Sequence, residues 1–217
     1  IYVTQCKSSK KKKKIKLGVC LILQKHKKKI QEALLELMKT KKFEVITVSD
    51  ITSSIDINRS TFYRHYLDKY DVLEKIEDNI LIEITNFHNK FINNLSNKNI
   101  DITFEISDYI NVDNNFFNIF EKHLSSMHIL MGENGSITFQ NKLKNTMLNV
   151  FKRTFSLASI NLNKIEKDLL FNFQSASFIS IINYWTEHPG LTVKELFPFY
   201  NRIISNGIVN FVKDNMN

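Results

Sequence analysis

The hydrophobic positions from residue 30 onward recur at steps of three and four residues, which is the period of an amphipathic α-helix. Ile30, Leu34 and Met38 lie on one face of the first such segment. Lysines follow it, at the end of a helix where the dipole favours cations. Only 5 glycines and 2 prolines occur in 217 residues, so the chain lacks the turn residues that a many-stranded β protein needs. The sequence therefore predicts an all-α fold.

Two short helices are predicted next, at residues 48–54 and 58–66. Thr47 suits the N-cap of the first helix, because its hydroxyl can accept a bond from a free backbone N–H. Residues 55–57 turn the chain, and Asn58 caps the second helix. Phe62 and Tyr66 are four residues apart and are expected to face inward. The outer side of the second helix then carries Arg59, Ser60, Tyr63 and Arg64.

A long fourth helix is predicted from Asp68, because an apolar stripe continues on one face as far as Phe91. The expected architecture has about nine helices: a helix-turn-helix domain of three helices, joined by the long helix to a C-terminal helical bundle. The expected parts are a basic, disordered arm at residues 1–24, the helix-turn-helix domain at 25–71 and the C-terminal domain at 72–217. After a polar break, five more helices are predicted at residues 104–110, 116–131, 139–155, 165–185 and 193–212.

The positive charge of the chain is concentrated at its beginning. Residues 1–29 hold 11 lysines and no acidic residue, and the remainder holds 19 basic and 22 acidic residues. The net charge of +8 therefore does not by itself indicate a nucleic-acid-binding domain. A basic arm attracts phosphate, and a solvated tail explains the same composition equally well. Cys6 and Cys20 both lie in this arm, so neither a core disulfide nor a metal-binding spacing is expected.

The lysine run followed by apolar residues 17–23 imitates a secretory signal, but the apolar run is short and no small-residue cleavage site follows it. No segment approaches the roughly 20 apolar residues that cross a bilayer. A cytoplasmic protein without membrane contact is expected.

The two short helices and their tight turn form the pattern that a major-groove reader requires. The groove is about 12 Å wide and admits one helix, whose side chains reach base edges while flanking groups hold phosphates. The second helix offers the small polar, aromatic and basic side chains that such contacts need. We therefore expect residues 47–70 to bind double-stranded DNA, with residues 58–66 in the major groove.

These residues resemble the DNA-binding region of the tetracycline-repressor (TetR/AcrR) family of regulators. The resemblance rests on Ile46-Thr-Val-Ser-Asp-Ile51, on Asn58-Arg-Ser-Thr-Phe-Tyr-Arg-His-Tyr66 and on Asp68-Lys69, and it covers about residues 26–76. It implies base contacts from Arg59 and Ser60. The complete DNA-binding set that we expect is Thr47, Val48, Asn58, Arg59, Ser60, Thr61, Tyr63, Arg64, His65 and Lys69.

The resemblance also implies which of these groups meet the DNA backbone. Thr61, Tyr63 and His65 fall where side chains usually contact phosphates, and Lys69 matches the family's phosphate-binding lysine. Thr47 or Val48 would present the N-terminus of its helix, which suits anions.

Two positions depart from the family pattern. The family usually has Ala-Gly where this chain has Ile55-Asp56. The turn needs a residue with φ above zero, a conformation that is easiest for glycine and that aspartate tolerates better than most residues. Ser60 stands where many members have glycine, and its hydroxyl is available for base readout.

The C-terminal half resembles the subgroup of the family that includes the dihydroxyacetone-kinase regulator, through residues 116–123, 131–135 and 181–190. The resemblance implies a homodimer formed by the last two long helices, for which packing within one chain is an equal alternative. It also implies a pocket for a small-molecule effector, although core packing is the favoured explanation of its candidate side chains. Those candidates are Phe120, Met127, Phe178 and Trp185.

No sequence motif indicates catalysis. His123 and His128 are five apart and so do not share a helix face, and the glycines at 132 and 135 lack the Lys-Ser/Thr of a phosphate loop. No enzyme, cofactor or metal is expected. The primary hypothesis is a ligand-responsive, homodimeric repressor that binds a pseudo-palindromic operator. The alternatives are a protein-interaction module that has lost specific DNA binding, and non-specific binding of membrane or RNA by the arm.

Overall fold

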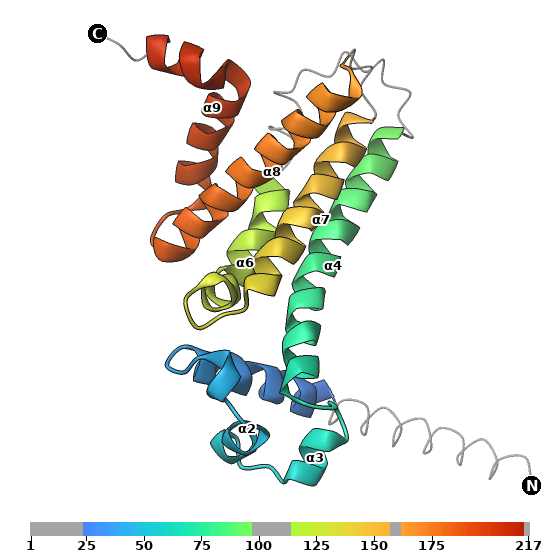
Figure 1. Ribbon diagram of the computed structural model, residues 1–217, viewed down its shortest axis with the longest axis vertical. Helices are drawn as coiled ribbons and strands as arrows, with labels where there is room; N and C mark the ends of the chain where they lie inside the picture. The colour runs from blue at the N-terminus through green and yellow to red at the C-terminus, as the bar shows by residue number, and fades with distance from the viewer. Residues whose placement is uncertain (1–23, 97–113, 157–161, 215–217) are drawn as a thin grey trace, which may run out of the picture. The chain divides into compact units, whose positions relative to one another are not determined.

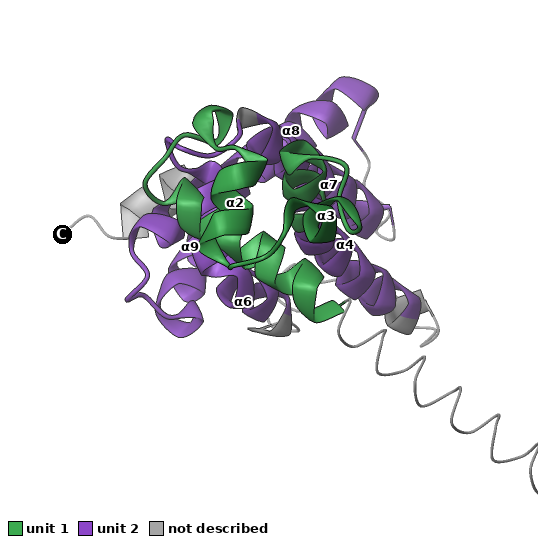
Figure 2. Ribbon diagram, turned by 90° about the horizontal axis from the view of Figure 1, so that it is seen from below, with its two compact units in different colours: residues 1–76 green, residues 77–217 purple. Residues whose placement is uncertain are grey.

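The computed structural model describes residues 24–96, 114–156 and 162–214. These residues form eight α-helices and one short 3-10 helix, without a strand among them, which confirms the all-α prediction of about nine helices (Figure 1). The chain divides into two compact units, residues 1–76 and 77–217, which Figure 2 shows in different colours. The domain boundary drawn from the sequence at residues 71 and 72 stays a prediction.

The first unit contains a helix at residues 24–38, the 3-10 helix η1 (Phe43–Val45), α2 (Val48–Ser54), α3 (Arg59–Tyr63) and the beginning of α4 (Lys69–Ser96). Apolar side chains three or four positions apart on these helices meet in one small core. Because burial of such side chains is the main favourable term in folding, this core fixes the short helices against each other. Its members include Ile30, Leu34, Met38, Phe43, Ile46, Ile51, Phe62 and Tyr66.

The bounds of α2 agree with the prediction, because a capping box defines its N-terminus. The Thr47 hydroxyl accepts a hydrogen bond from the backbone N–H of Asp50 at 3.1 Å, and the Asp50 carboxylate accepts one from the N–H of Thr47 at 2.8 Å. This pair satisfies two backbone donors that the helix itself leaves free.

The turn after α2 contains a residue with positive φ, as expected from the glycine that the family usually has at this position. Asp56 has φ of 51°, the only positive φ of a non-glycine residue in the described chain. The N–H of Ile57 bonds to the carbonyl of Thr52 at 3.0 Å, and the N–H of Asp56 bonds to that of Ser53 at 3.5 Å. These two bonds form a Schellman motif, in which the residue after the C-cap adopts the left-handed conformation.

Replacing Asp56 by Gly is expected to stabilise the protein by about 1 kcal/mol, because glycine adopts the left-handed region without the strain that a Cβ atom causes. Replacement by Ala should instead destabilise it. Midpoints of urea unfolding for the two variants and the unaltered chain measure the difference. Equal midpoints for Asp56→Gly and Asp56→Ala would show that the turn carries no such strain.

The helix α3 is shorter than predicted, since it ends at Tyr63 and not at Tyr66. Residues 64–66 continue as a hydrogen-bonded turn, in which the N–H groups of His65 and Tyr66 both bond to the carbonyl of Phe62. The Tyr66 hydroxyl donates to the carbonyl of Lys27 at 3.4 Å, which ties this turn to the first helix. The prediction that Asn58 caps α3 is right in position only, because its side chain makes no capping hydrogen bond.

The second unit contains most of α4, together with α6 (Asn114–Met131), α7 (Ile137–Phe155), α8 (Lys164–Glu187) and α9 (Val193–Asp214). The helices α6, α7, α8 and α9 confirm four of the five segments expected in this half. The fifth, at residues 104–110, lies outside the described residues. In Figure 1, α4, α7 and α8 run side by side, and α6 also packs against α7, α8 and α9.

Polar side chains join α4 to its neighbours in this unit. Glu77, 2% exposed, accepts a 2.7 Å bond from Lys142 on α7. His88 Nε2 lies 2.9 Å from the Thr154 hydroxyl, also on α7. Buried polar groups without partners are costly, so these pairs fix the register of α4 against α7. None of the described helices is long and apolar enough to cross a membrane.

Candidate nucleic-acid interface

The outward side of α3 carries the polar side chains that the sequence predicted there. Arg59, Ser60, Tyr63 and Arg64 are all exposed, and Tyr63 is 57% exposed despite its ring. Phe62, on the opposite side, is fully buried. The helix therefore presents two guanidinium groups, a phenol and a hydroxyl on one exposed surface, with a buried aromatic anchor behind them. Asn58 is exposed at the start of this surface, and Thr61 is half-buried.

The aromatic residues of α3 hold each other in place. The Phe62 ring contacts the Tyr63 ring edge-on, with centroids 5.4 Å apart, and lies 6.0 Å from the Tyr66 ring. Burial raises the pKa of Tyr66 to about 12, so its hydroxyl keeps its proton and remains a donor. Because Phe62 and Tyr66 are both buried, the direction of the Tyr63 side chain is set by the core of the unit.

The N-terminus of α2 is the second part of the candidate site. The Thr47 hydroxyl donates to Asp50 at 2.7 Å, and these bonds to Thr47 hold the pKa of the Asp50 carboxyl below its usual value. A carboxylate therefore lies at the helix terminus where the sequence predicted phosphate, with Lys41 3.7 Å away. Val48 is half-buried beside it. Sequence reasoning missed Asp50, although its spacing of three from Thr47 signals the capping box.

His65 lies at the end of the α3 segment and is half-buried. Its Nε2 atom is buried, and no hydrogen-bond partner for it occurs among the described residues. Burial lowers the pKa of His65, and electrostatic interactions with the neighbouring basic side chains of His26, Lys27 and Arg64 lower it further. The imidazole is therefore neutral at pH 7, so it offers a phosphate a hydrogen bond at most and no positive charge.

Lys69 has partners within its own unit. Its Nζ atom donates to three backbone carbonyl oxygens, those of Phe43 at 2.9 Å, Glu44 at 2.7 Å and Ile46 at 2.8 Å. These contacts differ from the phosphate contact that the sequence resemblance implied. The acceptors are main-chain atoms more than twenty residues away, so no sequence motif marks them.

The side chains expected to line a ligand pocket are buried in the second unit. Phe120, Met127, Phe178 and Trp185 are at most 2% exposed, and the Phe120 and Phe178 rings meet edge-on with centroids 5.1 Å apart. The Trp185 indole N–H donates to the carbonyl of Leu191 at 2.9 Å. These contacts agree with the core packing that we favoured for these residues, and their role as a pocket stays a prediction.

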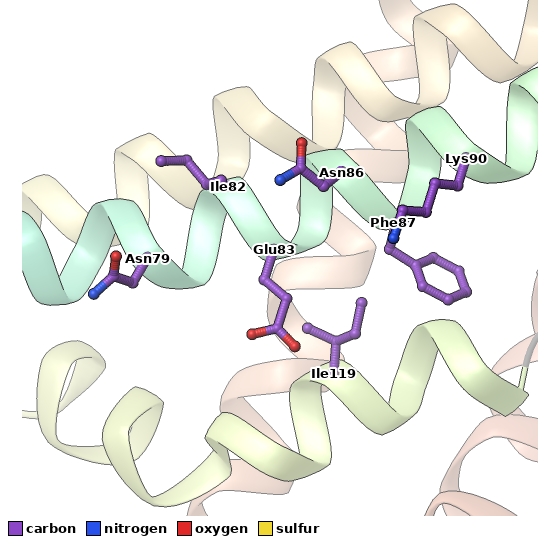
Figure 3. Close-up of a pocket in the computed structure, with 7 residues that line it drawn as sticks. All are labelled: Asn79, Ile82, Glu83, Asn86, Phe87, Lys90 and Ile119. Atoms are coloured by element: carbon purple, nitrogen blue, oxygen red, sulfur yellow. The ribbon is translucent and has the colours of Figure 1, made fainter. Parts of the chain in front are cut away.

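A pocket of about 380 Å³ lies instead between α4 and α6, and its lining mixes carboxylate, amide, ammonium and apolar groups (Figure 3). Glu83 points toward it and is held by α6, since Lys122 donates to both carboxylate oxygens at 2.8 Å and His123 Nε2 lies 2.9 Å away. The bond from Lys122 is the main cause of a lowered Glu83 pKa. The sequence did not indicate this pocket. Its lining residues are Asn79, Ile82, Glu83, Asn86, Phe87, Lys90 and Ile119.

The helix α8 leaves an apolar stripe exposed. Ile165, Leu169 and Phe173, spaced four apart, are 72%, 66% and 55% exposed, and Ala176 and Ser180 continue the exposed face. We call residues 165, 169 and 173 the α8 stripe. In α9, Leu196, Phe197 and Tyr200 are buried within the chain, and Phe199 is 48% exposed. This helix is interrupted at Gly207, where φ is 67° and ψ is 158°. Of the two helices expected at a dimer interface, α8 thus exposes the longer apolar stripe.

The C-terminal part of the chain is similar to a known protein family. Residues 108–206 match the TetR family model described as "Transcriptional regulator C-terminal region". No curated protein sequence matches the chain significantly.

Similar solved structures include a TetR transcriptional regulator from Streptococcus agalactiae, with a TM-score of 0.58 at 22% identity, which covers 87% of this chain and 98% of that one. A TetR-family regulator from Syntrophomonas wolfei gives a TM-score of 0.61 at 14% identity, over 85% and 97% of the two chains. The dihydroxyacetone kinase operon activator DhaS matches over 86% and 94% at 17% identity, with a TM-score of 0.46. Residues 108–206 thus match the C-terminal region of TetR-type transcriptional regulators, and the chain shares the all-α fold of the TetR regulator structures from Streptococcus agalactiae and Syntrophomonas wolfei.

Proposed function

We propose that this protein is a transcriptional regulator that binds a specific DNA sequence through α3 and acts as a homodimeric, ligand-responsive repressor. The observation that carries the proposal is the exposed side of α3, where Arg59, Ser60, Tyr63 and Arg64 project together from a helix anchored by the buried Phe62. Two such helices in a dimer would enter successive major grooves, roughly 34 to 36 Å apart on a pseudo-palindromic operator.

The proposed contacts divide into two kinds. Arg59 and Ser60 lie in the first turn of α3 and are proposed to read base edges, since arginine donates two bonds to guanine. Tyr63, Thr61 and Arg64 are proposed to hold phosphates, together with the backbone N–H groups near Thr47. Such contacts fix the register of the helix on the duplex without reading sequence.

The excess of basic residues in the described part of this unit is small. Residues 24–76 contain 11 basic and 8 acidic residues, and the Asp50 carboxylate adds negative charge at the start of α2. Specificity in the proposed complex therefore depends on placed contacts more than on general attraction to DNA.

Replacing Arg59 by Ala should weaken binding to the selected operator about 10- to 100-fold, because one bidentate base contact is worth about 1–3 kcal/mol. The effect on random DNA should be much smaller. Replacing Tyr63 by Phe should weaken binding to both duplexes alike, since it removes only a phosphate donor. Selection of bound duplexes from random DNA, followed by affinity measurements at fixed salt, tests both expectations.

Lys144→Ala serves as the matched control, because Lys144 is an exposed cation on α7 in the other unit. Operator affinity should not change in this variant. If Arg59→Ala bound the selected operator as tightly as the unaltered chain, α3 would not be the reading helix. A co-purified protein partner together with no selected DNA sequence would favour the alternative of a protein-interaction module.

For the effector we propose the pocket between α4 and α6. Its volume falls within the range of about 300–1,000 Å³ typical of small-molecule sites. Glu83 and the amides of Asn79 and Asn86 offer polar contacts, and Phe87 and Ile119 offer apolar ones. A ligand held there would shift the population between two states of the dimer, provided that it binds one of them more tightly.

The proposed function includes a cytoplasmic location, since a protein that binds operator DNA must have access to that DNA.

A further inference from the structure

The Lys69 ammonium group has a complete set of acceptors within the first unit. A lysine carries three N–H donors, and the carbonyls of Phe43, Glu44 and Ile46 accept one bond each at 2.7–2.9 Å. The Nζ atom also lies 4.8 Å from the centroid of the Phe43 ring and 5.3 Å from that of the Tyr70 ring. The negative faces of two aromatic rings therefore add to the attraction of three carbonyl dipoles.

These carbonyls belong to the segment that leads directly into α2. The carbonyl of Phe43 also accepts the backbone N–H of Ile46 at 3.2 Å, and the carbonyls of Glu44 and Ile46 lie at the end of η1, where helical acceptors commonly lack a partner within the helix. The third acceptor is the carbonyl of Ile46, and the next residue, Thr47, is the N-cap of α2. Lys69 itself stands at the start of α4. One ammonium group thus joins the first turn of α4 to the backbone immediately before α2.

We propose that Lys69 is a positioning residue, which holds residues 43–46 and through them the N-terminus of α2, and that it does not contact DNA phosphate. A phosphate oxygen would have to compete with three carbonyls for the same three protons. Only the consequence of this role for DNA binding rests on the proposed function, because the contacts themselves exist without DNA.

The geometry separates this role from that of a phosphate contact. Lysine directs three donors from one nitrogen atom, whereas arginine presents a planar fork. Lys69→Arg therefore keeps the charge but cannot place three donors at the same carbonyls. A phosphate contact would tolerate this exchange, and the positioning role would not.

The first experiment uses the full chain without DNA. Hydrogen–deuterium exchange of backbone amides in residues 43–50 should be about tenfold faster or more in both Lys69→Met and Lys69→Arg, because hydrogen bonds from a charged donor are lost. Lys75→Met, at an exposed lysine of the same helix, should leave this exchange unchanged. Unchanged exchange in both Lys69 variants would overturn the proposal.

A measurement on the unaltered chain covers the case in which the variants do not fold. Nitrogen-15 NMR of the lysine ammonium groups should show protons of Lys69 that exchange with water much more slowly than those of Lys75. Equal exchange for these two ammonium groups would contradict the proposed contacts.

The second experiment uses a duplex that the unaltered chain selects from random DNA, titrated at several salt concentrations. Both Lys69 variants should bind about tenfold more weakly or worse, with an unchanged slope of log affinity against log salt. Loss of one phosphate contact would instead reduce the slope by about 0.9. Wild-type affinity in Lys69→Arg together with a reduced slope in Lys69→Met would overturn the proposal. If no duplex is selected, the proposed function fails, and the exchange measurements still decide the role of Lys69.

Discussion

Replacing Leu169 by Asp is expected to convert the proposed homodimer to a monomer and to abolish the proposed operator binding. Leu169 lies in the middle of the α8 stripe, with Ile165 and Phe173 four residues to either side, and all three are more than half exposed. Exposed apolar surface of this kind marks an interaction site, and helices of homodimers commonly pair through such surfaces across a twofold axis. The substitution would place a carboxylate from each protomer in the interface.

The expected weakening of the dimer is about 100-fold or more, since an unpaired buried charge costs about 3–5 kcal/mol. Sedimentation velocity over a range of protein concentrations measures it, and circular dichroism verifies that the helices are kept. Leu67→Asp is the control for the sedimentation measurement, because Leu67 is an 82% exposed aliphatic residue of the first unit, and this variant should remain a dimer. A Leu169→Asp variant that remained a dimer would exclude the α8 stripe from the interface.

Lowering the pH from 7 to 5 is expected to destabilise the second unit by about 2 kcal/mol through His88. This side chain is 3% exposed. The Thr154 hydroxyl donates a hydrogen bond to the carbonyl of Val150, so it accepts one from His88 Nε2–H. Burial, helped by the charge of Arg153, lowers the His88 pKa from 6.5 to about 4.

The direction of this effect follows from proton binding. Between pH 6.5 and 4 the unfolded chain binds a proton at His88 that the folded chain excludes, so the stability is present above pH 6.5 and is lost as the pH falls toward 4. Urea unfolding followed by the fluorescence of Trp185, the only tryptophan, reports on this unit.

His88→Gln should retain a donor for Thr154 and flatten the dependence between pH 6.5 and 5. His128→Gln, at an exposed histidine on α6, should retain the dependence of the unaltered chain. An equally steep loss of stability in His88→Gln would assign the effect to other groups.

The parts of the fold that follow local rules could be predicted from the sequence. Thr47 was recognisable as an N-cap residue, which made the beginning of α2 predictable, although its capping-box partner Asp50 was missed. The requirement for a positive φ in the turn was also predictable, because the family places glycine where Asp56 stands. The helices from α6 to α9 followed from apolar periodicity and from the turn-forming residues between them, since each helix is long enough to repeat its pattern several times.

Contacts between distant segments could not be predicted. His88 and Thr154 are 66 residues apart, and nothing in either local pattern indicates their partner. The acceptors of Lys69 are backbone carbonyls, which every residue carries, so their convergence depends on the folded chain. The length of α3 was overestimated for a related reason. The Tyr66 hydroxyl donates a hydrogen bond to the carbonyl of Lys27 in another helix, and the local sequence pattern does not indicate this contact.

The candidate site itself was partly predictable. Exposure of Arg59, Ser60, Tyr63 and Arg64 followed from helical spacing around Phe62. The pocket between α4 and α6 did not, since most of its lining comes from polar positions of α4 that look like an ordinary solvent-facing surface. The residues named from the sequence as pocket candidates are instead buried in the core of the second unit.

The α8 stripe also bears on how the proposed regulator would respond to its own abundance. If operator binding requires two protomers joined through α8, occupancy at low protein levels rises with the square of the protomer concentration. Halving the amount of protein would then reduce occupancy about fourfold. A surface of three side chains on one helix would thus make repression sensitive to small changes in synthesis or degradation of the chain.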